Sequence, residues 1–168
     1  MKILIAQSHP SYESFSEAIL QVVLESLEQT DAEVSLVRVG KQESSLSAEF
    51  EKPDLLVLIY PTWWGGYPAS LLQWIQDSLL SRIGMLANVQ KIISVTTHGS
   101  SKLVNIVQGE WGKAYTEREL LPLCRKDVQS DWLSLYKIDR QRPENLEAFL
   151  KGLSESFIEL SENQAIIF

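Results

Sequence analysis

Three short segments combine hydroxyl, imidazole, glycine and aromatic residues, and each follows an apolar run. The first segment, residues 7–16, is rich in serine and contains His9. It leads into a predicted helix that begins after Ser14, where the S-x-x-E pattern is typical of a helix N-terminus. Open backbone N–H groups and the helix dipole make such a place suitable for a phosphate. The plainer alternative is a capped helix after a polar turn, and the residues alone leave both readings open.

The second segment, residues 61–68, reads P-T-W-W-G-G-Y-P. Two adjacent tryptophans and a tyrosine are costly to expose, so they belong to the core, to an interface, or to one wall of a pocket for a flat ring. Gly65 and Gly66 would let the backbone approach such a ring closely. Composition alone slightly favours the core or an interface.

The third segment, residues 96–101, reads T-T-H-G-S-S. Small residues leave backbone N–H groups accessible, and such groups can bind the polar edge of a ring and stabilise negative charge on it. His98 is the candidate acid or base in this segment. A single loop histidine is, however, more often an ordinary hydrogen-bonding residue.

Composition and missing motifs exclude several classes of protein. The chain has 168 residues and a net charge of −7, so it lacks the basic balance of a nucleic-acid-binding protein. One cysteine, Cys124, and two histidines make a metal site improbable. The sequence contains no G-x-x-x-x-G-K-[ST] or G-x-G-x-x-G motif, which argues against a nucleoside triphosphatase and a Rossmann dinucleotide site. It also contains no G-x-S-x-G hydrolase motif.

No segment resembles a membrane anchor or a signal peptide. The longest uninterrupted apolar run is residues 55–60, far short of the roughly 20 residues of a spanning helix. We therefore expect a protein of the cytoplasm that is not embedded in a membrane.

Alternating strand-like and helix-like periods indicate the elements that position the three segments. Strands are expected at residues 2–6, 34–39, 54–60, 91–97 and 132–138, and helices at 15–30, 68–80, 116–126 and from Pro143 onward. This alternation predicts an α/β fold, a flavodoxin-like three-layer sandwich with a five-stranded parallel sheet in the order 2-1-3-4-5. A single domain over residues 1–168 is expected. Ligands of such sheets bind at the carboxyl ends of the strands, where all three segments fall.

Three other regions give weaker signals. Residues 46–50 suggest a short helical turn. Residues 102–115 lack a clear period and are expected to form a packed irregular connection, with a lid over the third segment as the alternative. The tail, residues 161–168, ends in I-I-F, and such an apolar terminus is expected to dock on its own chain or on a partner subunit.

Taken together, the three segments resemble the flavodoxin-fold NAD(P)H:quinone oxidoreductase family, particularly its short bacterial members. The matching pieces are I-L-I-A-Q-S-H-P with S-F-S, then D-L-L-V-L-I-Y-P-T-W-W-G-G-Y-P-A, then S-V-T-T-H-G. The later pieces E-L-L-P-L-C and W-L-S-L-Y-K-I-D are similar too. The resemblance covers nearly the whole chain, with the pieces in the same order.

The resemblance implies a flavin, FMN or FAD, and the two-electron hydride transfer from NADH or NADPH to quinone-like acceptors. It places the flavin phosphate in a loop with His9, Ser14, Phe15 and Ser16. It places the edge of the isoalloxazine ring beside Pro61, Thr62, Trp63, Trp64 and Gly65. It places the polar side of the ring beside Thr96, Thr97, His98 and Gly99. It also implies a homodimer with the active site at the subunit boundary.

The chain departs from the family pattern at four positions. The family continues its second motif as P-A-x-L-K-G-W-x-D, whereas this chain has Leu72, Gln73 and Gln76 at the lysine, glycine and aspartate positions. Ser100 replaces the final glycine of the third motif. These changes motivate the alternative of a regulatory or ancillary subunit with little or no reductase activity. A one-electron carrier is disfavoured because the T-x-T-G-x-T phosphate loop of such carriers is absent.

Overall fold

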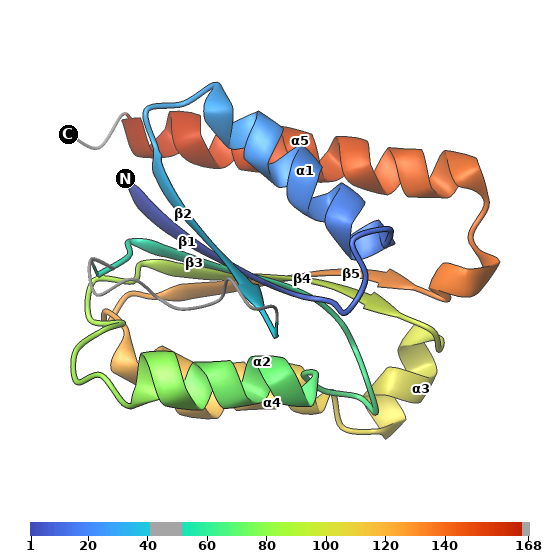
Figure 1. Cartoon of the computed structure of the whole chain (residues 1–168), viewed down its shortest axis with the longest axis horizontal. Coiled ribbons are helices and arrows are strands. Elements are labelled where there is room, and N and C mark those ends of the chain that lie inside the picture. Colours follow the sequence, from blue (N-terminus) through green and yellow to red (C-terminus); the bar gives the residue numbers. More distant parts are fainter. Residues whose placement is uncertain (41–51, 166–168) are drawn as a thin grey trace.

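A five-stranded parallel sheet forms the centre of the computed structural model, which describes residues 1–40 and 52–165. Its strands are β1 (Lys2–Ser8), β2 (Glu33–Val39), β3 (Leu55–Pro61), β4 (Lys91–His98) and β5 (Gln129–Tyr136). They lie in the order β2-β1-β3-β4-β5 (Figure 1). The predicted fold class and strand order are therefore confirmed.

The strand register brings the three segments to one edge of the sheet. Ser8 pairs with Val39, Pro61 pairs with Thr97, and His98 pairs with Tyr136. These pairs lie at the carboxyl ends of neighbouring parallel strands. The loops after β1, β3 and β4 consequently leave the sheet on the same side, which we call the carboxyl edge.

Helices cover both faces of the sheet. On one face lie α1 (Phe15–Glu28) and α5 (Pro143–Ala165), and on the other lie α2 (Ala69–Trp74) and α4 (Trp111–Tyr115) (Figure 1). The strands are apolar on both sides because each face buries its own core. Ile19 and Phe157 belong to the core under α1 and α5, whereas Leu58 and Trp74 belong to the core under α2.

Two helices change their winding along their length. Helix α2 continues into a π-helical segment, η1 (Ile75–Leu80), so the predicted helix over 68–80 is confirmed as a helical region. Helix α4 continues into η2 (Thr116–Leu120) and η3 (Leu121–Leu123). The predicted helix over 116–126 is thus displaced: it begins earlier, and it ends after Pro122, whose ring removes an amide donor.

The expectation of an irregular connection over residues 102–115 was wrong. This stretch contains α3 (Lys102–Val107) and α4, and Ser101 caps α3 by accepting the Val104 N–H at 3.4 Å. The sequence of α3 shows no amphipathic period because apolar residues occupy its solvent-facing side, where polar residues are usual. The exposed apolar residues of α3 are Leu103, Val104, Ile106 and Val107.

Two sequence-based expectations, the helical turn at 46–50 and the docking of the apolar tail, fall at least partly outside the described residues. Within the described ranges, no helix is both long and apolar enough to cross a bilayer. The same residues hold no group of three or more histidine, cysteine, aspartate or glutamate side chains placed to bind a metal ion.

Candidate functional site

The first segment folds back on itself through neutral hydrogen bonds. The Ser14 hydroxyl accepts the Glu17 N–H at 3.2 Å and donates to the Ser11 carbonyl at 3.2 Å. The Ser11 N–H in turn donates to Nδ1 of His9 at 3.0 Å. The predicted cap at Ser14 is therefore confirmed, and His9 shapes the turn before the helix.

The N-terminus of α1 offers backbone donors at the carboxyl edge. The amides of Phe15 and Ser16 occupy the first turn of α1, where a helix supplies no partner of its own. The Phe15 ring packs against Phe149 of α5 at a centroid distance of 6.3 Å, and Ser16 is buried. Phe15 is half-buried, and its backbone N–H and that of Ser16 lie at the N-terminus of α1.

The second segment begins with a tight turn. Trp63 and Gly66 exchange backbone hydrogen bonds of 3.1 and 3.0 Å, and the residues between them, Trp64 and Gly65, have φ angles of 52° and 78°. Two successive left-handed residues define a type I′ turn, which glycine adopts freely and tryptophan adopts at a cost. Trp64 is 99% exposed, so it does not belong to the core. Trp63 is 47% exposed.

Tyr67, at the end of the same segment, is a core residue. Its ring contacts that of Tyr60 edge-on at 4.8 Å, and its hydroxyl bonds that of Thr116. Burial raises the pKa of Tyr67 to about 12, so the phenol stays protonated across the physiological range. Tyr67 thus anchors a turn whose tryptophans point outward.

The third segment is fixed by a buried network around His98. The Nδ1 atom of His98 lies 2.8 Å from Oδ1 of Asn105, and its Nε2 atom lies 3.3 Å from the Ser134 hydroxyl. The ring also stacks on Tyr136 at 4.5 Å. Asn105 donates from Nδ2 to the Ser100 hydroxyl at 2.8 Å, which leaves Oδ1 as the acceptor and puts the proton on Nδ1 of His98.

These contacts give His98 a positioning role. Both ring nitrogens have partners within the chain, and the residue is 4% exposed, so the geometry does not favour proton exchange with a substrate. Thr96 and Thr97 are buried as well, which leaves the backbone of residues 99–101 as the accessible part of this segment. Asn105 could not be predicted from the sequence, because the exposed apolar residues of α3 hide its helical period.

We expect stability to fall in mild acid because of His98. Burial lowers the pKa of His98 below its ordinary value of 6.5, so the unfolded chain binds this proton more readily than the folded chain does. Neutral His98 makes its full contribution to the free energy of unfolding above about pH 6.5. This contribution is lost as the pH falls from there through the lowered pKa of the folded state. Urea unfolding at several pH values should show this slope in the wild type and a flatter one in His98→Gln. Equal slopes would contradict the assignment.

Hydrogen bonds join the loops at the carboxyl edge. The Thr62 N–H donates to the Thr97 carbonyl at 2.7 Å, and the hydroxyls of Thr62 and Thr96 lie 2.6 Å apart. These bonds bring the second and third segments together as predicted. The first segment is linked to α2, the helix that follows the second segment, through the hydroxyls of Ser8 and Ser70, which lie 3.0 Å apart.

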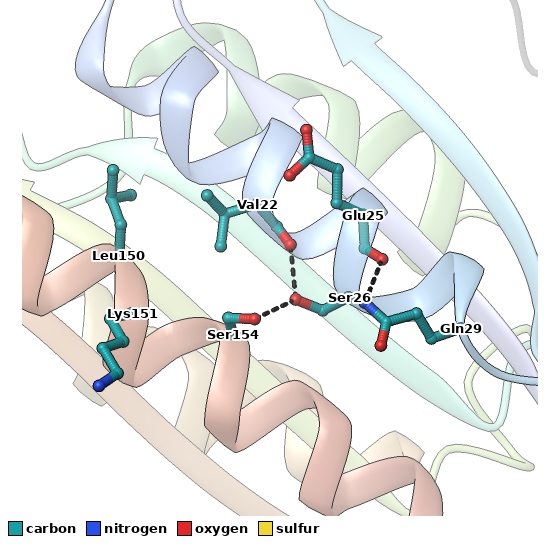
Figure 2. Close-up of a pocket in the computed structure, with 7 residues that line it drawn as sticks. All are labelled: Val22, Glu25, Ser26, Gln29, Leu150, Lys151 and Ser154. Atoms are coloured by element: carbon teal, nitrogen blue, oxygen red, sulfur yellow. Dashed lines mark hydrogen bonds between the residues drawn. The ribbon is translucent and has the colours of Figure 1, made fainter.

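A groove of about 320 Å³ lies elsewhere, between α1 and α5. Figure 2 shows the hydroxyls of Ser26 and Ser154 meeting across it, at 2.9 Å. Its α1 residues belong to the second half of that helix, whereas the carboxyl edge adjoins the first turn. This groove is therefore separate from the three segments.

An open parallel sheet in this strand order, with helices on both faces, defines the doubly wound class of α/β proteins. A family model described as a flavodoxin-like fold matches residues 1–117. The chain belongs to this family.

Solved structures with the same fold include several oxidoreductases. A protein from Streptococcus mutans is 21% identical, with a TM-score of 0.75 over 95% of this chain and 100% of that chain. An NAD(P)H:quinone oxidoreductase from Methanothermobacter marburgensis is 20% identical, with a TM-score of 0.69 over 95% and 96% of the two chains. An FMN-dependent NADH-azoreductase from Bacillus anthracis, in complex with FMN, is 13% identical, with a TM-score of 0.74 over 95% and 99%. No curated protein matches the sequence.

Proposed function

We propose that this protein is a flavin-dependent NAD(P)H oxidoreductase that reduces quinone-like acceptors by two-electron hydride transfer. The observation that carries this proposal is the gathering of three loops at the carboxyl edge, two of which are tied together by the bonds from Thr62 to Thr96 and Thr97. Proteins of the same fold include an NAD(P)H:quinone oxidoreductase and an azoreductase that holds FMN. The chemistry of those two proteins agrees with the chemistry that the three segments favour.

The residues at this edge fit a flavin, FMN or FAD. The amides of Phe15 and Ser16, at the positive end of α1, would hold a phosphate without a basic side chain. Ser14 and His9 would keep that turn in shape through their loop bonds. A bound flavin supplies reversible two-electron chemistry, and the protein supplies its binding, orientation and electrostatic environment.

The other two segments would hold the ring system. Pro61, Thr62 and the turn that contains Trp63, Trp64 and Gly65 would lie along one edge of the ring. The backbone N–H groups near Gly99, held in place by Thr96, Thr97 and His98, would bind its polar side and stabilise negative charge on it. In this assignment His98 positions the loop, and no side chain of the chain is required as an acid or base.

We also propose that the protein works as a homodimer in the cytoplasm. A strained, fully exposed Trp64 lies in the loop after β3, and the apolar surface of α3, including Leu103 and Val107, belongs to the helix after β4. The Gly65 carbonyl accepts the Gly112 N–H at 3.3 Å, which holds the turn against the region that follows α3. A second copy over this surface would remove the aromatic and aliphatic side chains from water and complete the site.

The proposal predicts a coloured protein with a measurable turnover. We expect the purified chain to show flavin absorbance, or to gain it on titration with FMN or FAD, and denaturation to release a flavin identifiable by mass. NADH or NADPH oxidation with a benzoquinone as acceptor should then be flavin-dependent. Light scattering on the same sample should give the mass of a dimer.

Each result bears on a different part of the proposal. Protein that stays colourless with both flavins would overturn the flavin assignment. Flavin binding without turnover would favour the regulatory subunit over the reductase. A flavin-loaded monomer with full turnover would contradict the dimer alone.

A further inference from the structure

The first turn of α1 carries an acid beside the proposed phosphate site. Glu17 is the third residue of the helix, and its side chain is 14% exposed. A carboxylate at this position interacts favourably with the positive end of the helix dipole, but it repels an incoming phosphate dianion. Water screens such a half-buried charge less than a fully exposed one. The site therefore needs a compensating cation.

Arg38 of β2 supplies that cation through a two-pronged ion pair. Its Nη1 and Nη2 atoms lie 2.5 and 2.7 Å from Oε2 and Oε1 of Glu17. The Arg38 side chain is 20% exposed. Paired bonds of this kind fix both the charge and the orientation of the guanidinium. The sequence pattern at the helix start gives no indication of this partner.

The same guanidinium contacts the loop that leads into α1. The Arg38 Cζ atom lies 5.3 Å from the ring centroid of Tyr12, within the range of a cation–π contact. Tyr12 belongs to the first segment, and its side chain is otherwise largely exposed. One guanidinium thus connects a strand, the first turn of α1 and the loop before it.

We propose that Arg38 is a positioning residue that makes the N-terminus of α1 competent for a phosphate-bearing ligand. It neutralises Glu17 beside the helix amides, and its contact with Tyr12 keeps the guanidinium next to the loop that leads into the helix. This inference rests on the proposed function. It adds that the preference for a phosphorylated flavin over an unphosphorylated one depends on the Arg38–Glu17 pair, which does not itself contact the ligand.

Comparing FMN with riboflavin separates this role from general stability, because riboflavin has the same ring and no phosphate. Dissociation constants are measured by flavin fluorescence for the wild type, Arg38→Met, Glu17→Gln and the double variant. Arg38→Met should weaken FMN binding by about tenfold or more, the effect of one uncompensated charge near a dianion. Its riboflavin affinity should stay within about twofold of wild type.

The other variants test the electrostatic cause. The double variant removes both charges and should restore FMN affinity to within about threefold of wild type. Glu17→Gln alone leaves the positive charge of Arg38 without its acidic partner, so it should tighten FMN binding. This variant keeps the test decisive if Arg38→Met fails to fold. Arg38→Lys retains the charge and should keep most of the preference for FMN over riboflavin.

A purely structural ion pair would give a different pattern. Equal loss of both ligands in Arg38→Met, or no recovery of FMN binding in the double variant, would overturn the inference. FMN binding that is indifferent to Arg38 would also overturn it and leave the proposed function intact. Wild-type protein that binds neither flavin would overturn the proposed function, and this inference with it.

Discussion

Asn105→Leu should lower the free energy of unfolding by about 3 kcal/mol. Asn105 is 3% exposed and contacts His98, Ser100 and Ser101 through hydrogen bonds of 2.8, 2.8 and 2.9 Å. Leucine has the same number and branching of side-chain heavy atoms, so the loss comes from hydrogen bonds rather than from a cavity. The Nδ1–H of His98 would remain buried without an acceptor, and an unpaired buried donor costs more than the bond was worth.

Chemical denaturation of the wild type and Asn105→Leu measures this change. Glu155→Gln is the matched control, because Glu155 lies on the solvent face of α5 and its side chain is 63% exposed. The control should stay within about 0.5 kcal/mol of wild type. A similarly small change in Asn105→Leu would show that the network around His98 does not hold the third segment.

Asn105→Asp offers a second readout of the same network. The substitution keeps an acceptor for His98 but places an oxygen where Nδ2 donates to the Ser101 carbonyl. The two oxygens repel, while the new carboxylate stabilises protonated His98 and raises its pKa. NMR titration of the imidazole should detect this rise. An unchanged titration would indicate that the two side chains do not interact in solution.

Gly66→Ala should destabilise the chain by about 2 kcal/mol and displace Trp111. A Cβ atom at Gly66 would lie 2.3 Å from Cε3 of Trp111, far inside van der Waals contact. The Trp111 ring also contacts Tyr67 and Tyr115, at centroid distances of 6.3 and 5.3 Å, so it cannot move without disturbing the anchor of the second segment. The penalty is steric, since the backbone of Gly66 is not left-handed.

A double-mutant cycle isolates this contact. Removing the ring with Trp111→Ala should make the Gly66→Ala change nearly neutral, so the two effects should be strongly non-additive. Gly152→Ala is the control, because an added Cβ there meets nothing within 4 Å and the site lies inside a helix, where alanine is favoured. Additive effects in the cycle would contradict the close contact between Gly66 and Trp111.

The fold was readable from the sequence because the central strands are strongly apolar and α1 begins at a recognisable cap. The run from Leu55 to Tyr60 is buried on both faces, as a central parallel strand requires, and Ser14 caps α1 as its pattern indicates. Helix α3 was missed because its apolar residues face solvent. An amphipathic period cannot appear where the exposed face is itself apolar.

The candidate site was only partly predictable. The order of the strands places the three segments at one edge, and this follows from the sequence pattern alone. The partners that hold those segments come from elsewhere in the chain: Asn105 from α3, Ser134 from β5 and Arg38 from β2. Such tertiary contacts leave no local signature, so the sequence indicated His98 without indicating that both its nitrogens are occupied.

The bonds that tie the second segment to the third involve uncharged groups: a pair of hydroxyls, and a backbone N–H with a carbonyl oxygen. Dissolved ions weaken attractions between exposed charges, such as the Lys151–Glu155 pair on α5, but they hardly affect bonds between neutral dipoles. The link between the second and third segments should therefore hold the same shape in dilute buffer and in concentrated brine.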